Sequence, residues 1–367
     1  MNEQLKQALK QEDTILFIGS GISCWSGLPS WTGLLNQLAD LLQCSSRDAE
    51  LVRKEIKQDL LQAASYGFDQ LTAAEVGEFM RKACQLGTAA PHKIHRRIVS
   101  LGPRCFITTN YDQLLEESLR TWQPGRPFRT VTNKQPFEEA DIIQARKLDF
   151  VFKPHGDVGD VESIVLTREQ YRKLLEGGEW RHALESLKTL LVTRRVVYLG
   201  FGLRDPDFLL LRDVLANTWK GGTRDHYAIM ADVGSGEIGY WRKNYGIHLV
   251  GYQTSELRGG TRDHSRLLGL LDEFLQPITA TAAAKVVADS SLELTLSLLR
   301  YASGLMRFEA VTPELPLRVH STRGWKYAPE KLSRLTAGTT RLPRHFWKRG
   351  RNVLSFLAGQ VQERRMV

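Results

Sequence analysis

Four short stretches carry the residues best suited to chemistry, and each of them follows an apolar run. The first is GSGIS at residues 19–23, which continues to GLP at residues 27–29. Glycines at a strand-to-helix turn let backbone N–H groups approach a pyrophosphate, and the N-terminus of the next helix favours its negative charge. A plain tight turn would use the same glycines, so this stretch by itself leaves the ligand undecided.

The second stretch is TTNYD at residues 108–112. The amide of Asn110 could hold an amide ligand or a water molecule, and the carboxylate of Asp112 could accept a hydrogen bond from an amide NH₂ group. Asn, Asp and Thr are equally good helix N-caps, so a capping role stays open.

A histidine and a second pair of glycines complete the set. His155 lies in KPHGD at residues 153–157, and an imidazole is a natural general base because its pKa lies near neutrality. A lone histidine is nevertheless more often structural. Gly200, Gly202 and Asp205 belong to GFGLRDP at residues 200–206, where they could seat a ribose or a phosphate or could simply cap a helix.

The elements that must position these residues form an α/β fold with a Rossmann-like, mainly parallel sheet. Apolar runs that predict buried strands, spaced by helical segments, lie at residues 14–18, 104–108, 150–153, 195–199, 226–231 and 248–251. Residues 36–90 have a helical period and predict a helical insertion, whereas the Pro, Gly and Arg of residues 122–135 predict an exposed loop. Because the carboxyl ends of parallel strands lie along one rim, we expect the four stretches to converge there.

The composition is that of an ordinary soluble globular protein. The 367 residues, 42% of them hydrophobic, suggest roughly two domains and argue against a disordered chain. The apolar runs are too short to cross a membrane, and the polar N-terminus lacks a signal core, so we expect a cytoplasmic protein. The net charge of +9 favours anionic partners without selecting one. Four scattered cysteines and unpaired histidines predict neither a disulfide framework nor a metal site.

In this combination and order, the four stretches resemble the Sir2 (sirtuin) superfamily. Sirtuins build an NAD⁺ pocket from a G-A-G-x-S…G-I-P segment, a T-Q-N-x-D segment, an H-G pair and a G-T-S turn. Here these elements stand as GSGIS…GLP, TTNYD, HGD and GFGLRDP, between residues 14 and 270. The chain is most similar to the Sir2-like NAD-hydrolase domains of bacterial antiphage systems, in which VFKPHGD, a V-L-T-x-x-x-Y stretch and GFGLRDPDF are typical.

The resemblance implies that NAD⁺ is the substrate and that its nicotinamide–ribose bond is cleaved. Asp112 would hold the nicotinamide carboxamide, Asn110 would position a water or a ribose hydroxyl, and His155 would act as the base. The residues that would wrap the pyrophosphate are Gly19, Ser20, Gly21 and Ser23, and Gly27 would also belong to the NAD⁺-binding set. The residues beside the adenosine half would be Gly200, Gly202 and Asp205. Whether NAD⁺ is hydrolysed or cyclised stays open.

Two departures from sirtuins weigh against a protein deacylase. The two zinc-binding C-x-x-C pairs of deacylases are missing from the sequence, and Ser30-Trp31 replaces the peptide-facing F-R pair, so no zinc is expected. An NAD-dependent deacylase and a non-catalytic nucleic-acid-binding module are the alternatives to an NAD⁺ hydrolase.

The remaining expectations concern organisation and control. We expect a Sir2-like domain at residues 1–275 and a C-terminal assembly or interaction domain at residues 276–367. Residues 318–351 are rich in Arg and Lys with interleaved aromatic residues, which suits nucleic acid as well as an ordinary solvated face. An effector of antiphage defence that depletes NAD⁺ (abortive infection) must be controlled, so the resemblance implies a homo-oligomer and a HerA-type ATPase or a sensor as partner.

Overall fold

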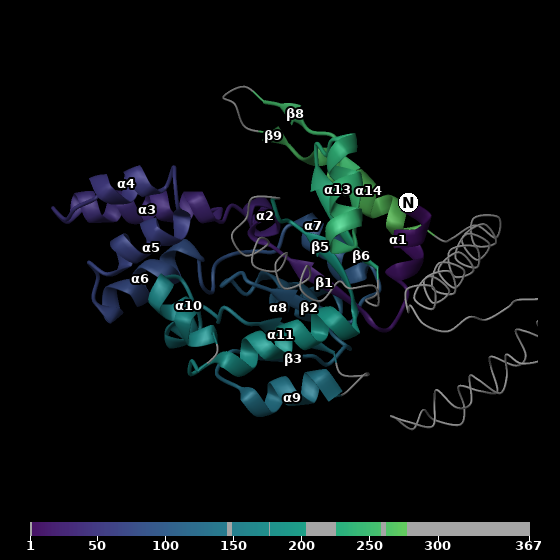
Figure 1. The fold of residues 1–367 in the computed structure, drawn as a ribbon, viewed down its shortest axis with the longest axis horizontal. Coiled ribbons are helices and arrows are strands. Elements are labelled where there is room, and N and C mark those ends of the chain that lie inside the picture. Colours follow the sequence, from purple (N-terminus) through teal and green to yellow (C-terminus); the bar gives the residue numbers. More distant parts are fainter. Residues whose placement is uncertain (1, 145–148, 176, 203–224, 258–261, 277–367) are drawn as a thin grey trace, which may run out of the picture. The chain divides into compact units, whose positions relative to one another are not determined.

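The core of the molecule is a seven-stranded sheet in which every strand pairs with its neighbours in parallel (Figure 1). The computed structural model describes residues 2–144, 149–175, 177–202, 225–257 and 262–276. The strands are β1 (Thr14–Ile18), β2 (Cys105–Thr108), β3 (Arg129–Thr132), β4 (Phe150–Lys153), β5 (Arg195–Leu199), β6 (His226–Ala231) and β7 (Ile247–Tyr252). Their order across the sheet is β3-β4-β2-β1-β5-β6-β7. The predicted Rossmann-like α/β fold is therefore confirmed.

The central strands are buried on both faces, which explains their continuous apolar sequences. In β1, Ile15 and Phe17 contribute to one hydrophobic cluster, whereas Leu16 and Ile18 contribute to the cluster on the opposite face. All five residues of β1 are buried. Strands of this kind have no solvated face, so their side chains do not alternate between apolar and polar.

Helices cover both faces of the sheet. The first face packs against α9 (Pro136–Gln144), α10 (Arg168–Leu174), α11 (Arg181–Thr193) and α13 (Ser235–Tyr245). The second face packs against α1 (Asn2–Ala8), α7 (Lys93–Ser100), α8 (Leu114–Trp122) and α14 (Ser265–Leu275). The sheet is therefore the middle of three layers, and its carboxyl rim is left for the loops that carry the polar stretches.

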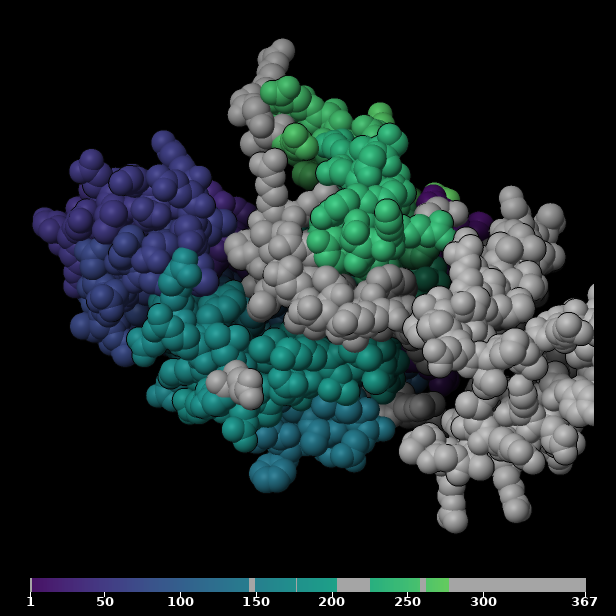
Figure 2. All heavy atoms as spheres, viewed as in Figure 1, coloured from purple at the N-terminus to yellow at the C-terminus, as the bar shows by residue number. Residues whose placement is uncertain are grey.

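A separate hydrophobic cluster forms beyond that rim. It is built by α3 (Trp31–Cys44), α4 (Glu50–Glu55), α5 (Leu60–Phe68) and α6 (Ala73–Ala83), which lie between β1 and β2 in the chain. Leu35, Leu38 and Leu42 fall on one face of α3 and are fully buried. Figure 2 shows these helices as a purple-to-blue lobe beside the teal atoms of α10 and α11.

The helical lobe is fastened to the rest of the molecule at the start of α10. The guanidinium of Arg168 forms an ion pair with Asp59 and donates a 2.7 Å hydrogen bond to Gln62, and the backbone N–H of Arg168 donates to the hydroxyl of Ser65. These bonds join two segments about a hundred positions apart, so the lobe is held close to the rim of the sheet.

One expectation from the sequence is wrong. The sequence of residues 122–135 predicts an exposed loop, but these residues contain β3, an edge strand. Of its four residues, Val131 alone is buried, so the stretch lacks the apolar run by which the other strands were found. A two-stranded antiparallel hairpin of β8 (Ser255–Glu256) and β9 (Arg262–Asp263) was also not anticipated.

The predicted domain boundary after residue 275 stays a prediction. The basic segment at residues 318–351 and Asp205 both lie outside the described residues. No helix in the described part of the chain is long and apolar enough to cross a membrane.

Candidate active site

The carboxyl ends of β1 and β5 mark the place where the connections of the sheet change direction. From β1 the chain continues to β2 on one side, whereas from β5 it continues to β6 on the other side. In open α/β sheets, ligands bind in the crevice outside the strands at such a switch point. Gly19 directly follows β1 and Gly200 directly follows β5, so two of the four predicted stretches lie at this crevice.

These two glycine turns pack against each other through their backbones. The N–H of Gly19 donates a 2.8 Å hydrogen bond to the carbonyl of Leu199, and the N–H of Gly21 donates a 3.0 Å bond to the carbonyl of Gly200. A Cβ atom would lie only 2.6 Å from the Gly200 oxygen if placed on Gly19, and 2.7 Å from it if placed on Gly21. Both glycines are thus required for close packing of the turns, and their N–H groups already have partners within the chain.

Three buried polar side chains join the ends of β1 and β2. The hydroxyl of Ser23, in the four-residue helix α2 (Ser20–Ser23), donates a 2.6 Å hydrogen bond to Asp112. The same hydroxyl accepts a 2.9 Å bond from the side-chain amide of Asn110. The second carboxylate oxygen of Asp112 accepts from the backbone N–H of Leu114 at the start of α8. The structure therefore brings the GSGIS and TTNYD stretches into direct contact.

The polar trio opens onto a cleft with an apolar wall. Ser20, Ser23, Asn110 and Asp112 line this first cleft. The other lining residues are Leu28, Pro29, Ser30, Trp31, Leu34, Ala83, Cys84, Thr109, Tyr111 and Tyr171. Most of the apolar ones come from the segment before α3, from α3 itself and from α6. A flat, partly polar ring could lie against this wall while the trio binds its polar substituent.

His155 is close to the first cleft but is not among the described residues that line it. Its side chain is buried, and its ring packs edge-on against Tyr171 with 5.1 Å between centroids. The backbone N–H of Val165 donates a 3.0 Å hydrogen bond to the His155 carbonyl, and the hydroxyl of Tyr111 donates to the Val165 carbonyl. Tyr171 thus stands beside His155 and the cleft at once.

A second, wider cleft lies on the other side of α2. Gly21, Gly200 and Gly202 line it, together with Ile22, Cys24, Trp25, Phe201, Ile229, Met230, Ala231, Tyr252, Leu257, Arg262, Asp263, His264 and Leu267. Gly27 lines neither cleft within the described residues; it has a positive φ of 81° at the end of a short 3-10 helix (Cys24–Ser26). Seven of the predicted site residues that the structure describes therefore line one or the other of two clefts with α2 between them, whereas Gly19, Gly27 and His155 line neither.

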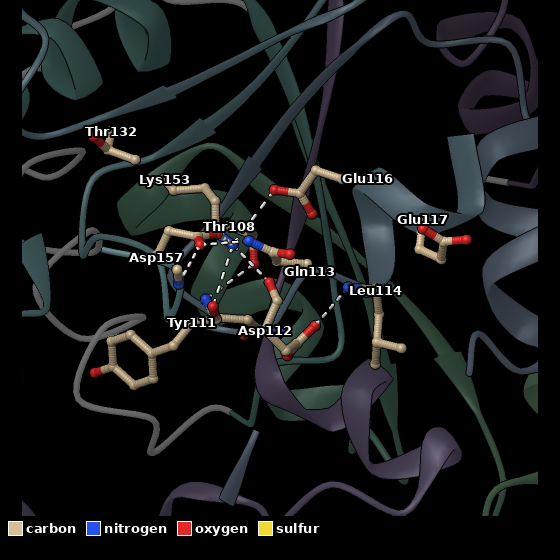
Figure 3. A network of polar contacts seen from close by, with 12 residues as sticks. Thr108, Tyr111, Asp112, Gln113, Leu114, Glu116, Glu117, Thr132, Lys153 and Asp157 are labelled. Carbon is tan, nitrogen blue, oxygen red and sulfur yellow. Dashed lines mark hydrogen bonds and ion pairs between the residues drawn. The ribbon is translucent and has the colours of Figure 1, made fainter. Parts of the chain in front are cut away.

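Sequence reasoning missed the charged cluster beneath the trio. Lys153, Glu116 and Asp157 are buried there, and Figure 3 shows them around the Tyr111–Asp112 backbone. The signal that could have revealed the cluster is a lysine at the end of an apolar strand, in KPHGD, because a charged residue in such a place needs a buried partner.

Two titratable groups near the site are held neutral. Burial lowers the pKa of His95 on α7 to about 4, against the attraction of the nearby Asp112, and its Nδ1 accepts a hydrogen bond from the N–H of His92. Burial raises the pKa of the Cys84 thiol to about 12. Near neutral pH His95 and Cys84 therefore add no charge to the surroundings of the first cleft.

Within the part of the chain that the structure describes, no group of three His, Cys, Asp or Glu side chains is placed to hold a metal ion. All four cysteines are free, and Cys24 and Cys44 are exposed.

Comparison with known proteins gives several curated relatives, among them the following three. The chain is 27% identical over 233 residues to the NAD(+) hydrolase ThsA of Enterococcus faecium, covering 63% of this chain and 46% of that protein. It is 26% identical over 262 residues to the NAD(+) hydrolase ThsA of Cytobacillus dafuensis, covering 69% and 48%. Defense-associated sirtuin 2 of Bacillus subtilis is 22% identical over 255 residues, covering 68% and 24%.

The chain spans about half the length, or less, of these curated relatives. A solved structure of a mutant Sir2 homologue in complex with ADP ribose aligns with a TM-score of 0.38 and 14% identity, over 75% of this chain and 95% of that one. The family model of the SIR2-like domain matches residues 104–250, from the strand that ends in the TTNYD stretch to the last strand of the sheet. The chain is thus similar to SIR2-like domains over the part that runs from β2 to β7.

Proposed function

We propose that this chain cleaves the nicotinamide–ribose bond of NAD⁺ and releases nicotinamide and ADP-ribose. The observation that carries the proposal is the hydrogen-bonded trio of Ser23, Asn110 and Asp112, which joins the carboxyl ends of β1 and β2. Two of the relatives described above are named NAD(+) hydrolases, which supports the same reaction class.

The proposed chemistry needs few groups because the leaving group is already cationic. Departure of nicotinamide gives an oxocarbenium-like transition state, which is stabilised by oxygen atoms near the ribose. Asp112 would hold the carboxamide in the first cleft, and Asn110 would place a water molecule at the anomeric carbon. Ser23 would keep these two side chains at a fixed separation.

His155 is the proposed base that takes a proton from the water or from a ribose hydroxyl. Its imidazole lies against Tyr171, so we expect Tyr171 to turn aside when the ribose enters. The adenosine half would occupy the second cleft beside Gly200 and Gly202, and the pyrophosphate would cross α2.

The proposed setting is antiphage defence, as the name of the Bacillus subtilis relative suggests. Uncontrolled loss of NAD⁺ would harm the host, so we propose that the protein acts in the cytoplasm, that it assembles as a homo-oligomer, and that a HerA-type ATPase or a sensor controls it. Light scattering of the purified protein, alone and with the product of the neighbouring gene, tests the assembly.

The decisive experiment is incubation of the purified protein with NAD⁺ and no acylated peptide, with and without that neighbouring gene product. Mass-resolved analysis should find nicotinamide and ADP-ribose in equal amounts. Cyclic ADP-ribose would identify cyclisation instead, and a requirement for an acylated peptide would identify a deacylase. Absence of nicotinamide in every mixture would refute the proposal.

A further inference from the structure

A buried cation lies directly beneath the Asn110–Asp112 segment. Lys153, the last residue of β4, is 0% exposed. Its ammonium group donates a 2.6 Å hydrogen bond to the backbone carbonyl of Asp112 and a 3.4 Å bond to that of Tyr111 (Figure 3). The ammonium therefore binds the main chain of the segment that carries the candidate site residues.

The same ammonium also binds two carboxylates from different elements. Asp157, in the loop after β4, forms a close ion pair with it, and Glu116 on α8 lies 3.4 Å away. The other oxygen of Asp157 accepts a 2.7 Å bond from the side chain of Gln113, just before α8. Lys153 thus joins the end of β2, the start of α8 and the loop that contains His155.

Stability alone is a poor reason for this arrangement. Taking an ammonium and two carboxylates out of water is costly, and apolar side chains of similar volume often serve the fold equally well. Burial acts to lower the pKa of Lys153, but the attraction of Glu116 and Asp157 outweighs it and raises that pKa above its usual value. What the charged cluster provides, and an apolar one would not, is a set of directed bonds to two backbone carbonyls.

We infer that Lys153 is a positioning residue, which holds the Asn110–Asp112 segment and the His155 loop in one fixed relation. The inference rests on the NAD⁺-cleaving function proposed above. A misplacement of a catalytic group by about 1 Å can lower the rate about 100-fold. The bonds of a single buried side chain that fixes such a group can therefore change the rate of the reaction.

The test uses the full chain with a double substitution, Lys153→Met together with Asp157→Asn. Removing both members of the ion pair avoids an unpaired aspartate, and the new amide oxygen can still accept the bond from Gln113. Burial raises the pKa of Glu116, so this remaining carboxyl group can take up a proton. The control is Lys134→Met, which removes an exposed lysine paired with Asp160 and Glu162 and so breaks ion pairs away from the segment.

For the double variant we expect kcat for nicotinamide release to fall about 100-fold while the KM for NAD⁺ stays within about threefold. Hydrogen exchange of the backbone amides at residues 109–114 should become faster, and the Lys134→Met control should match the wild type in all three measurements. A kcat within about threefold of the wild type, in a variant that is folded by circular dichroism, overturns the inference.

If the double variant does not fold, Lys153→Arg takes its place as the test of the inference. It keeps the charge and the ion pairs, but a planar guanidinium cannot place its donors as the ammonium does, so kcat should fall about 10-fold; unchanged kcat overturns the inference. The exchange measurement separates this inference from the proposed function. If the wild type releases no nicotinamide, the proposed function fails, and unchanged exchange at residues 109–114 in the variant would independently refute the role of Lys153.

Discussion

The hydroxyl of Ser23 donates a 2.6 Å hydrogen bond to the carboxylate of Asp112, although 89 positions separate the two residues. Both side chains are buried, and the same hydroxyl accepts a bond from Asn110. A single oxygen atom therefore sets the distance between the two side chains to which we assign contact with NAD⁺.

Ser23→Ala should lower kcat for nicotinamide release by about 10- to 100-fold, because a hydrogen bond to a charged group contributes about 1.5–3 kcal/mol. The fold should persist, as no large side chain is lost. Ser45→Ala is the matched control, since this exposed hydroxyl bonds only the nearby Leu41 carbonyl among the described contacts. Steady-state kinetics of both variants check the prediction, and equal rates would contradict it.

Asn110→Ala and His155→Ala should each abolish nicotinamide release without unfolding the protein. The first removes the group that would hold the attacking water, and the second removes the proposed base. Chromatography of the NAD⁺ reaction, alongside the melting temperature of each variant, provides the measurement. Full activity in both variants would remove the catalytic assignment.

Gly21→Ala should destabilise the fold by about 1–3 kcal/mol, as overpacking of a tight contact does. The new Cβ would lie 2.7 Å from the Gly200 carbonyl oxygen, where only backbone could give way. Gly239→Ala, within α13 and facing open space, is the control and should leave stability unchanged or raise it by up to about 1 kcal/mol. Urea unfolding measures both, and similar midpoints for the two variants would disprove the packing requirement.

Stability should fall as the pH drops from 6.5 toward 4. Burial lowers the pKa of His95 and of His226 to about 4, below the value of about 6.5 in an unfolded chain. Between these values the unfolded chain binds more protons, so the stabilisation is complete above pH 6.5 and is lost as acid is added. Each histidine contributes a slope of up to about 1.4 kcal/mol per pH unit.

The measurement is urea unfolding at several pH values in this range. His226→Asn keeps an acceptor oxygen near the position of Nδ1 for the N–H of Val196 but cannot titrate, so it should flatten the slope. A slope that the substitution leaves unchanged would assign the pH dependence to other groups.

The strands with both faces buried could be predicted from the sequence, because the continuous apolar runs of β1 and β5 indicate burial on both faces of a sheet. The start of α10 also has a local cause, because Thr167 and Gln170 form reciprocal capping bonds at its first turn. By contrast, β3 could not be found, since it lies at the edge of the sheet with Val131 as its single buried residue. Local patterns identify strands that are buried on both faces. They miss an edge strand, in which buried and exposed positions are mixed.

The candidate site was predictable to a similar extent. That polar stretches after β1, β2 and β5 would meet follows from parallel strands sharing a rim. The sequence does not show which backbone N–H groups stay available to bind a ligand. The hydrogen bond from the N–H of Gly21 to the carbonyl of Gly200, for example, depends on how two distant turns pack. The part that we infer for Lys153 was equally hidden, since Glu116 and the carbonyl of Asp112 belong to a segment that only the fold brings to it.

The helix α2 has a consequence for molecules made to occupy this site. Ser20 and Ser23 line the first cleft while Gly21 and Ile22 line the second, so the helix lies between the two clefts. Two weakly binding fragments, one for each cleft, could be joined across α2 by a short anionic linker. The joined compound would bind more tightly than either fragment, because binding of the first half gives the second half a high effective concentration.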